Sequence, residues 1–149
     1  MGFIGTHKAK LDDKGRLVLP SEFKGTLPAD EIPHFVVRRD LNAMCLEMFT
    51  YEVWSAMATQ IRSQLNLMDK DDAQYWRWYM RGTAEVCADP KIGRITIPRE
   101  FLEGIGVTKD VVFSGLDYKI EIWAKENFDL GEMEKPLVEG YNRKLTLTI

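Results

Sequence analysis

The chain has 149 residues and a mass of 17.2 kDa, which suits one compact domain or two very small halves that share a core. Its hydrophobic content of 45% and charged content of 29% are ordinary for a globular protein and exclude disorder as the default. A formal net charge of −3 argues against a simple nucleic-acid binder, because such proteins are usually basic. The sequence contains neither an apolar run long enough for a membrane span nor a signal-peptide pattern, so we expect no membrane partner.

The charges are unevenly distributed along the chain. Residues 1–24 carry five Lys or Arg residues against three acids, whereas residues 126–149 carry five acids against three Lys or Arg residues. We therefore expect one basic edge and an acidic tail, so that the net charge alone does not decide against binding to phosphates.

The two cysteines, Cys45 and Cys87, belong to no CxxC motif and have no histidine at ligand spacing. This pattern argues against a metal centre, and it is typical of a protein in a reducing cytoplasm. We expect both side chains to be small, buried and apolar. No other motif in the sequence calls for a cofactor.

The elements in chain order begin with short strands. We expect four of them, at residues 3–11, 17–19, 35–39 and 44–49. From Thr50 onward the apolar residues recur with helical spacing, which predicts an amphipathic helix with Thr50 as its N-cap. A second helix is predicted to begin at Asp69 or Asp71 and to end at Gly82.

A second set of strands follows this helical hairpin. We expect them at residues 83–88, 94–97, 111–113 and 119–123. Gly115 to Tyr118 is expected to form the turn into the last strand. Residues 124–130 repeat the start of the first helix, and Pro136 and Gly140 then interrupt the pattern. Residues 144–149 suit either an edge strand or a frayed tail.

One stretch of the sequence occurs twice. LDDKGRLVLPSEF at residues 11–23 returns as DPKIGRITIPREF at residues 89–101, with Arg16 and Arg94 in the same frame. Duplication of this kind predicts two copies of one structural unit.

Each copy predicts an arginine held on a rigid turn. Turn-forming residues precede Arg16, and Gly15 is free to adopt a positive φ. The apolar strand that follows ends at Pro20, because proline supplies no N–H to a ladder. A short helical turn then begins, with Phe23 facing inward. In the second copy residues 89–93 make the turn.

Arg16 and Arg94 are the main candidates for a binding site. An arginine fork on a turn suits phosphate oxygens or the O6/N7 edge of guanine. The alternative is that each arginine only braces its own turn by pairing with a nearby carboxylate. We assign the salt-dependent phosphate contacts to nearby lysines, namely Lys8, Lys10, Lys14 and Lys91.

The second helix is rich in aromatic residues interleaved with arginines. Such residues can stack on nucleic-acid bases, but they are also enriched at protein interfaces. We interpret the aromatic residues of both helices as core or subunit-interface residues, namely Trp54 in the first helix and Trp76, Trp78 and Tyr79 in the second. The sequence has no nucleophile elbow, P-loop or GxGxxG motif, and His7 and His34 belong to no motif. We therefore expect no enzymatic activity.

The two segments of Gly-Arg, apolar strand and proline resemble the MraZ family of bacterial transcriptional regulators. That family is built from two AbrB-like (SpoVT-AbrB, swapped-hairpin) DNA-binding units with one DxxxR motif each. Asp12 and Arg16 match the motif fully. In the second repeat its aspartate position is Pro90, and Asp89 lies one residue too early. Asp89 takes over the bracing of Arg94 if the second turn carries a bulge.

The resemblance covers residues 5–129 and implies an α+β fold of two pseudo-symmetric AbrB-like units joined by an α-helical hairpin. We expect the units at residues 7–54 and 83–126, the hairpin at 55–82 and a C-terminal tail at 127–149. The resemblance also implies that residues of each turn brace its arginine, namely Asp12, Gly15, Asp89 and Gly93.

The resemblance further implies a cytoplasmic, nucleoid-associated, homo-oligomeric ring. Such a protein binds short direct repeats in double-stranded DNA upstream of its own cell-division and cell-wall gene cluster, and represses that cluster. Two alternatives stay open. One is an AbrB-like antitoxin that holds a toxin protein. The other is an assembly protein without DNA binding, which the departure at Pro90 favours.

Overall fold

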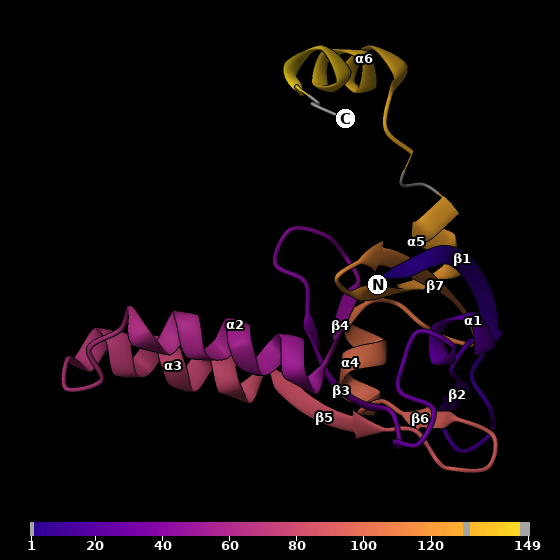
Figure 1. Ribbon diagram of the computed structural model, residues 1–149, viewed down its shortest axis with the longest axis horizontal. Coiled ribbons are helices and arrows are strands. Elements are labelled where there is room, and N and C mark those ends of the chain that lie inside the picture. Colours follow the sequence, from indigo (N-terminus) through magenta and orange to yellow (C-terminus); the bar gives the residue numbers. More distant parts are fainter. Residues whose placement is uncertain (1, 130–131, 147–149) are drawn as a thin grey trace.

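The computed structural model describes residues 2–129 and 132–146 and has the mixed α+β architecture that the sequence predicted (Figure 1). The strands are β1 (Phe3–Lys10), β2 (Arg16–Val18), β3 (His34–Arg39), β4 (Leu46–Thr50), β5 (Thr83–Cys87), β6 (Arg94–Thr96), β7 (Asp110–Asp117) and β8 (Ile120–Ala124). The helices are α1 (Ser21–Lys24), α2 (Tyr51–Ser63), α3 (Lys70–Arg81), α4 (Arg99–Gly104), α5 (Lys125–Asp129) and α6 (Lys135–Lys144).

Six strands form one antiparallel sheet in the order β1-β7-β8-β4-β3-β5. The first strand of each repeat pairs with the other repeat, since β1 lies beside β7 and β5 lies beside β3. The two hairpins meet in the middle of the sheet, where β8 pairs with β4. Each half of the sheet therefore contains strands from both repeats, and neither repeat completes its half alone.

The short strands β2 and β6 form a separate antiparallel pair, in which Leu17 lies opposite Ile95. Leu17 is 1% exposed and Ile95 is fully buried, and both belong to the hydrophobic core that also contains residues of the large sheet. Side chains alternate between the two faces of a strand. The neighbours of Leu17 and Ile95 therefore point away from the core, and this places Arg16 and Arg94 on the outer face.

The helices α2 and α3 form the predicted hairpin and extend away from the sheets (Figure 1). The side chain of Thr50 accepts a hydrogen bond from the N–H of Val53 at 3.3 Å, and that of Asp69 accepts one from Asp72 at 3.1 Å. These side-chain caps fix where each helix begins. The predicted cap at Thr50 and the predicted end at Gly82 are confirmed, and of the two residues predicted to begin the second helix, Asp69 is the one that caps it.

The turn between β7 and β8 is tighter than the sequence predicted. Gly115 belongs to β7, which continues to Asp117 with a φ of 67°. Gly115 is needed for a different reason, because a Cβ there would lie 2.6 Å from the backbone carbonyl carbon of Phe3 on β1. Glycine in a strand often marks the close approach of another backbone, and in sequence it looks the same as a turn glycine.

The tail also differs from the prediction, because α6 runs through both Pro136 and Gly140. Pro136 lies in the first turn, where its missing N–H has no partner within the helix. A single internal glycine costs about 1 kcal/mol relative to alanine, which is too little to end a helix. Leu145 and Thr146 belong to no strand. The rest of the predicted tail strand, residues 147–149, and Leu130 of the predicted helix lie outside the described residues.

The expectation of two buried cysteines is correct for Cys45 and wrong for Cys87, which is exposed. Cys87 lies on the edge strand β5, where it follows Val86 and points to the opposite face. Burial raises the pKa of the Cys45 thiol, so this side chain stays neutral. In the part of the chain that the structure describes, no helix is long and apolar enough to cross a membrane.

Candidate nucleic-acid interface

The first turn, Asp12–Arg16, is organised by the carboxylate of Asp12. Its Oδ1 accepts hydrogen bonds from the backbone N–H groups of Lys14 at 2.9 Å and Arg16 at 2.8 Å. Its Oδ2 accepts one from Arg16 Nε at 2.8 Å. Gly15 adopts a φ of 77°, which closes the turn. One carboxylate therefore fixes both the backbone and the guanidinium of Arg16.

The second turn, Asp89–Arg94, reaches the same result with one more residue. Asp89 Oδ1 accepts hydrogen bonds from the N–H groups of Lys91 at 3.0 Å and Ile92 at 2.9 Å. Its Oδ2 accepts from the backbone N–H of Arg94 at 2.7 Å and from Arg94 Nε at 3.0 Å. Gly93 has a φ of 80°. Asp89 thus occupies the bracing place that the DxxxR spacing assigned to Pro90, because the extra residue is absorbed within the turn.

These hydrogen bonds also set the charge state of both carboxylates. The backbone N–H of Arg16 is the main cause that lowers the pKa of Asp12, and that of Ile92 is the main cause for Asp89. Asp12 and Asp89 are therefore ionised well below neutral pH. Each forms a charge-assisted hydrogen bond with its arginine.

The two arginines lie on one face of the β2–β6 pair. Arg16 is opposite Thr96 and Arg94 is opposite Val18, so the two arginines are diagonal neighbours. Diagonal neighbours in an antiparallel pair lie about 7–8 Å apart. The side chains of Arg16 and Arg94 are 28% and 31% exposed. In the part of the chain that the structure describes, the hydrogen bonds of both guanidinium groups use Nε, which leaves the outer Nη groups for a ligand.

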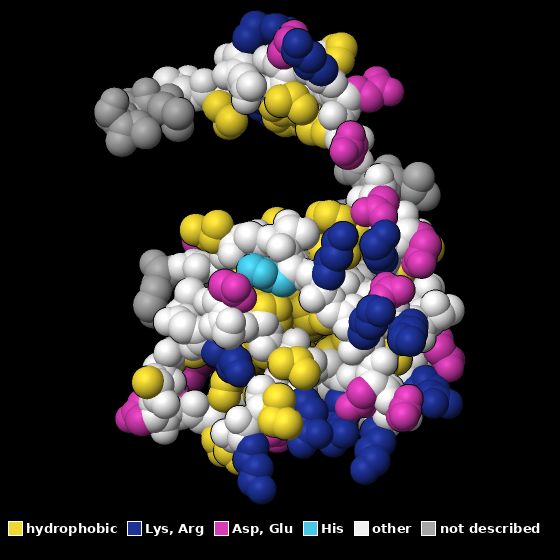
Figure 2. All heavy atoms as spheres, turned by 90° about the vertical axis from the view of Figure 1, so that its right-hand side faces the viewer, with side chains coloured by type: hydrophobic (Ala, Val, Ile, Leu, Met, Phe, Trp, Pro, Cys, Tyr) yellow, Lys and Arg dark blue, Asp and Glu magenta, His cyan; other side chains and the backbone are white. Residues whose placement is uncertain are grey.

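The predicted lysines surround this face from different elements. Lys14 and Lys91 lie within the first and second turns, and both are exposed. Lys8 and Lys10 lie on β1 and line an open groove of about 720 Å³. Figure 2 looks onto the side of the molecule that carries β1, β2 and β6, and shows Lys and Arg side chains gathered over its lower part.

Lys24 also belongs to this region, although the sequence did not single it out. It lines the same groove as Lys8 and Lys10. Its Nζ donates a hydrogen bond to the backbone oxygen of Ile92 at 3.1 Å, across 68 residues of sequence. Gly93 makes this approach possible, since a Cβ there would lie 2.8 Å from Lys24 Nζ. The only signal in the sequence is a lysine just after the first repeat, where the second repeat has Leu102.

The aromatic side chains of α3 are partly buried in the core and partly exposed on the surface. Tyr79 is 5% exposed and stacks on Trp76 with 5.4 Å between the ring centroids. Trp78 and Tyr75 are 50% and 43% exposed on α3. The packing interpretation therefore fits Tyr79, whereas Trp78 lies free on the surface of the single chain.

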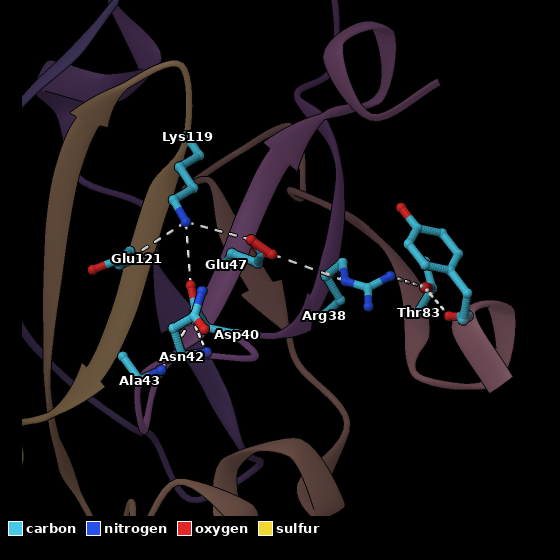
Figure 3. A network of polar contacts seen from close by, with 9 residues as sticks. Arg38, Asp40, Asn42, Ala43, Glu47, Thr83, Lys119 and Glu121 are labelled. Atoms are coloured by element: carbon cyan, nitrogen blue, oxygen red, sulfur yellow. Dashed lines mark hydrogen bonds and ion pairs between the residues drawn. The ribbon is translucent and has the colours of Figure 1, made fainter. Parts of the chain in front are cut away.

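A separate polar cluster joins the two repeats at the β4–β8 pair (Figure 3). Glu47 and Glu121 lie directly opposite each other there. Lys119 Nζ lies 3.2 Å from Asp40 Oδ2, 3.4 Å from Glu47 Oε1 and 3.5 Å from Glu121 Oε2. Burial acts to lower the pKa of Lys119, but the carboxylates of Glu47 and Asp40 outweigh it and raise the pKa. One ammonium group therefore offsets the repulsion between two facing glutamates.

The same cluster contains a set of possible metal ligands. The ligand atoms of Asp40, Cys45 and Glu121 lie within 4.8 Å of one another. Lys119 already supplies a cation to both carboxylates, at 3.2 and 3.5 Å. The neutral thiol of Cys45 is a poor ligand, because metals bind the thiolate. The cluster is explained as an ion-pair network within the fold.

The fold and this site together define a class of protein: a duplicated α+β unit whose repeats exchange strands and each present an arginine held by an aspartate. Comparison with known proteins identifies the family of the chain. A family model described as "MraZ protein, putative antitoxin-like" matches residues 79–137. The "Transcriptional regulator MraZ" of Bacteroides fragilis is 34% identical over 132 residues, which cover 89% of this chain and 83% of that protein.

Two further relatives carry the same name. That of Phocaeicola vulgatus is 33% identical over 147 residues, covering 97% of this chain and 92% of its own length. That of Lachnoclostridium phytofermentans is 36% identical over 127 residues, covering 85% and 84%. The chain belongs to the MraZ family. These relatives are named as regulators and not as enzymes, in agreement with the expectation from the sequence.

Proposed function

We propose that this protein is a sequence-specific, DNA-binding transcriptional regulator. The observation that carries the proposal is the pair of arginines on the outer face of β2 and β6, each held by a carboxylate. Arginine in a fixed orientation binds the O6 and N7 atoms of guanine with two hydrogen bonds. A separation of about 7–8 Å is close to two base-pair steps of about 3.4 Å each, so Arg16 and Arg94 suit two positions on one duplex that are separated by a single base pair.

Lysines supply the part of the affinity that does not depend on sequence. Lys14 and Lys91 flank the arginines, and Lys8 and Lys10 extend the positive surface along β1. Each lysine that contacts a phosphate releases counterions, so the affinity falls as the salt concentration rises.

We further propose that the fold consists of two pseudo-symmetric AbrB-like, swapped-hairpin units, at residues 7–54 and 83–126. Residues 55–82 join the units, and residues 127–149 form a tail. The exchange of β1 and β5 between the repeats supports this division.

The protein would act as a ring-shaped homo-oligomer. Trp78 and Tyr75, exposed on α3, are of the residue types that are enriched at protein interfaces. An oligomer lines up several pairs of turns along one DNA molecule, and a subunit with a net charge of −3 then binds by avidity.

The relatives named as transcriptional regulators support a role in the cytoplasm, in association with the nucleoid. The proposed target is a set of short direct repeats upstream of the protein's own gene, in a cell-division and cell-wall cluster that it represses. No cofactor is required for this function.

The test is fluorescence anisotropy of the wild type, Arg16→Ala and Arg94→Ala with the DNA upstream of the protein's own gene, across a salt series. Each substitution removes one base contact, and we expect the affinity to fall about 5- to 150-fold. Arg143→Ala on α6 removes the same charge away from the turns and serves as the matched control. Its affinity should stay within about twofold of the wild type.

Two results would contradict the proposal. If the wild type shows no salt-dependent binding, the protein is not a regulator of this kind, and the exposed aromatic residues of α3 become the place to look for a protein partner such as a toxin. If binding survives both arginine substitutions in folded protein, the turns are not the DNA-reading elements. Circular dichroism and size-exclusion chromatography establish that each variant is folded and assembled.

A further inference from the structure

We propose that Ile92 makes the second turn specific for a thymine, by contacting the C5 methyl group of that base. This inference rests on the proposed DNA-binding function and adds a residue and a base to it. It assigns different reading chemistry to the two turns, although both present an arginine.

Ile92 has the same place in the second turn as Lys14 in the first. Each lies two residues before the arginine of its turn. Ile92 is 50% exposed. A cation at one turn is therefore replaced by a branched apolar side chain at the other, on the part of the molecule that would meet DNA.

A single exposed isoleucine is common on protein surfaces and by itself needs no explanation. What distinguishes Ile92 is that its backbone is fixed on both sides. Its N–H donates to Asp89 Oδ1 at 2.9 Å, and its carbonyl oxygen accepts from Lys24 Nζ at 3.1 Å. The following residue, Gly93, is buried and allows Lys24 to approach.

This fixation prepares the side chain for contact. Isoleucine is branched at Cβ and has few χ1 rotamers, so little rotamer freedom remains to be lost on binding. Ile92 is thus presented rigidly between two cations, Lys91 and Arg94, which orient the turn on a polyanion.

The chemistry of the DNA grooves then identifies the ligand. The C5 methyl of thymine is the apolar group that the standard base pairs present in the major groove, and apolar side chains read it by direct contact. With Arg94 on the O6 and N7 atoms of a guanine, Ile92 lies where it meets a neighbouring base pair. The second turn therefore selects a thymine next to the guanine, whereas Lys14 at the first turn binds phosphate.

The experiment replaces each thymine of the upstream DNA in turn by 2′-deoxyuridine, which removes only the methyl group, and measures affinity by anisotropy. The wild type should lose about three- to fivefold in affinity at a thymine next to a guanine, the loss expected for one buried methyl group. Ile92→Ala should bind the thymine and deoxyuridine duplexes equally. Ile92→Lys, which copies the first turn, should also be insensitive and should steepen the salt dependence by about one unit.

Ile4→Ala is the matched control, because Ile4 is an exposed isoleucine near the opposite end of β1 from the first turn. This variant should keep the wild-type sensitivity to deoxyuridine. Urea unfolding checks that Ile92→Ala retains the stability of the wild type.

The inference is overturned if the wild type binds all deoxyuridine duplexes as tightly as the thymine duplex while Arg94→Ala still loses affinity. The proposed DNA-binding function then stands without it. It is also overturned if Ile92→Ala retains the wild-type loss at the same thymine. If the wild type binds none of the duplexes, the proposed function fails and the inference fails with it.

Discussion

The two turns present the same residue by different means. At the first turn Asp12 lies four residues before Arg16 and accepts three hydrogen bonds from the turn through its carboxylate. At the second, Asp89 lies five residues before Arg94 and accepts four. This difference shows that a fixed spacing between the aspartate and the arginine is not what the turn physically requires. The requirement is a carboxylate that reaches both the backbone N–H and the Nε of the arginine.

The turns also differ in their surroundings. A Cβ on Gly15 would meet nothing within 4 Å, whereas a Cβ on Gly93 would meet Lys24. The second turn is therefore fastened to the first repeat by Lys24, and the first turn has no equivalent at Leu102, which is buried in the core. Among the described residues, one side chain, that of Asp12, supports the first turn, and two side chains, those of Asp89 and Lys24, support the second. The second turn also accepts a backbone hydrogen bond from the first repeat, from Leu19 N–H to the carbonyl oxygen of Gly93 at 2.9 Å.

We expect the largest loss of stability from a substitution that weakens the contact between the two repeats and so affects both turns alike. Lys119→Met leaves three carboxylates of the network without their shared cation, and we expect a loss of about 3–5 kcal/mol in the free energy of unfolding. Because β4 and β8 come from different repeats, urea unfolding followed by fluorescence should show one transition at a lower midpoint. Lys125→Met is the control, since among the described residues this exposed lysine forms an ion pair with Asp129 alone, one helical turn away, and its midpoint should stay close to the wild type. Two separate transitions would show that the repeats fold independently.

A smaller loss of stability should distinguish the two turns from each other. Gly15→Ala and Gly93→Ala each place a side chain at positive φ, with an expected cost of about 1–2 kcal/mol. Gly93→Ala also displaces Lys24 from Ile92. In a Lys24→Met background the cost of Gly93→Ala should therefore decrease, whereas that of Gly15→Ala should not change. Urea unfolding of the wild type, the three single variants and the two double variants measures this, and equal costs of Gly93→Ala in both backgrounds would mean that Lys24 does not support the second turn.

Much of this architecture follows from local signals in the sequence. The cap at Thr50, the end at Gly82 and the inward Phe23 are where the sequence predicted them, and Asp69 is one of the two residues predicted to begin the second helix. Each of these features depends on neighbours within a few residues. The repeated stretch also predicted the positions of both arginine turns, because each turn is formed by residues that are close together in the sequence. The DNA-binding roles of Arg16 and Arg94 stay predictions.

What the sequence did not predict depends on contacts between distant segments. The hydrogen bond from Lys24 to Ile92 spans 68 residues and has no counterpart in the repeat. The close approach of the Phe3 backbone to Gly115 comes from the pairing of β1 with β7. The order of the elements along the chain does not specify that pairing. The bracing of Arg94 by Asp89 depends on a turn that absorbs one extra residue. The spacing of residues along the sequence does not show whether a turn can do so.

The next effect in size tests the two supports through DNA binding. Asp12→Asn weakens the hold on Arg16, and we expect about a fivefold loss of affinity. Asp89→Asn should lose only about twofold, because Lys24 still holds the turn. Anisotropy measures both, and the double variant Asp89→Asn with Lys24→Met should approach the loss seen for Asp12→Asn. A larger loss for Asp89→Asn than for Asp12→Asn would reverse the comparison.

The smallest expected difference between the two turns is in the pKa values of their aspartates. Asp12 and Asp89 both have lowered pKa values, and the reduction should be greater for Asp89, which accepts four hydrogen bonds rather than three. A carboxyl group whose pKa is lower in the folded state stabilises the fold fully above its unfolded pKa of about 3.9. That contribution is lost as the pH falls through the folded pKa. Carboxyl ¹³C NMR titration should therefore show Asp89 protonating at lower pH than Asp12, with both below about 3.9. The reverse order would mean that the longer turn holds its arginine less firmly, and that the extra residue weakens the site.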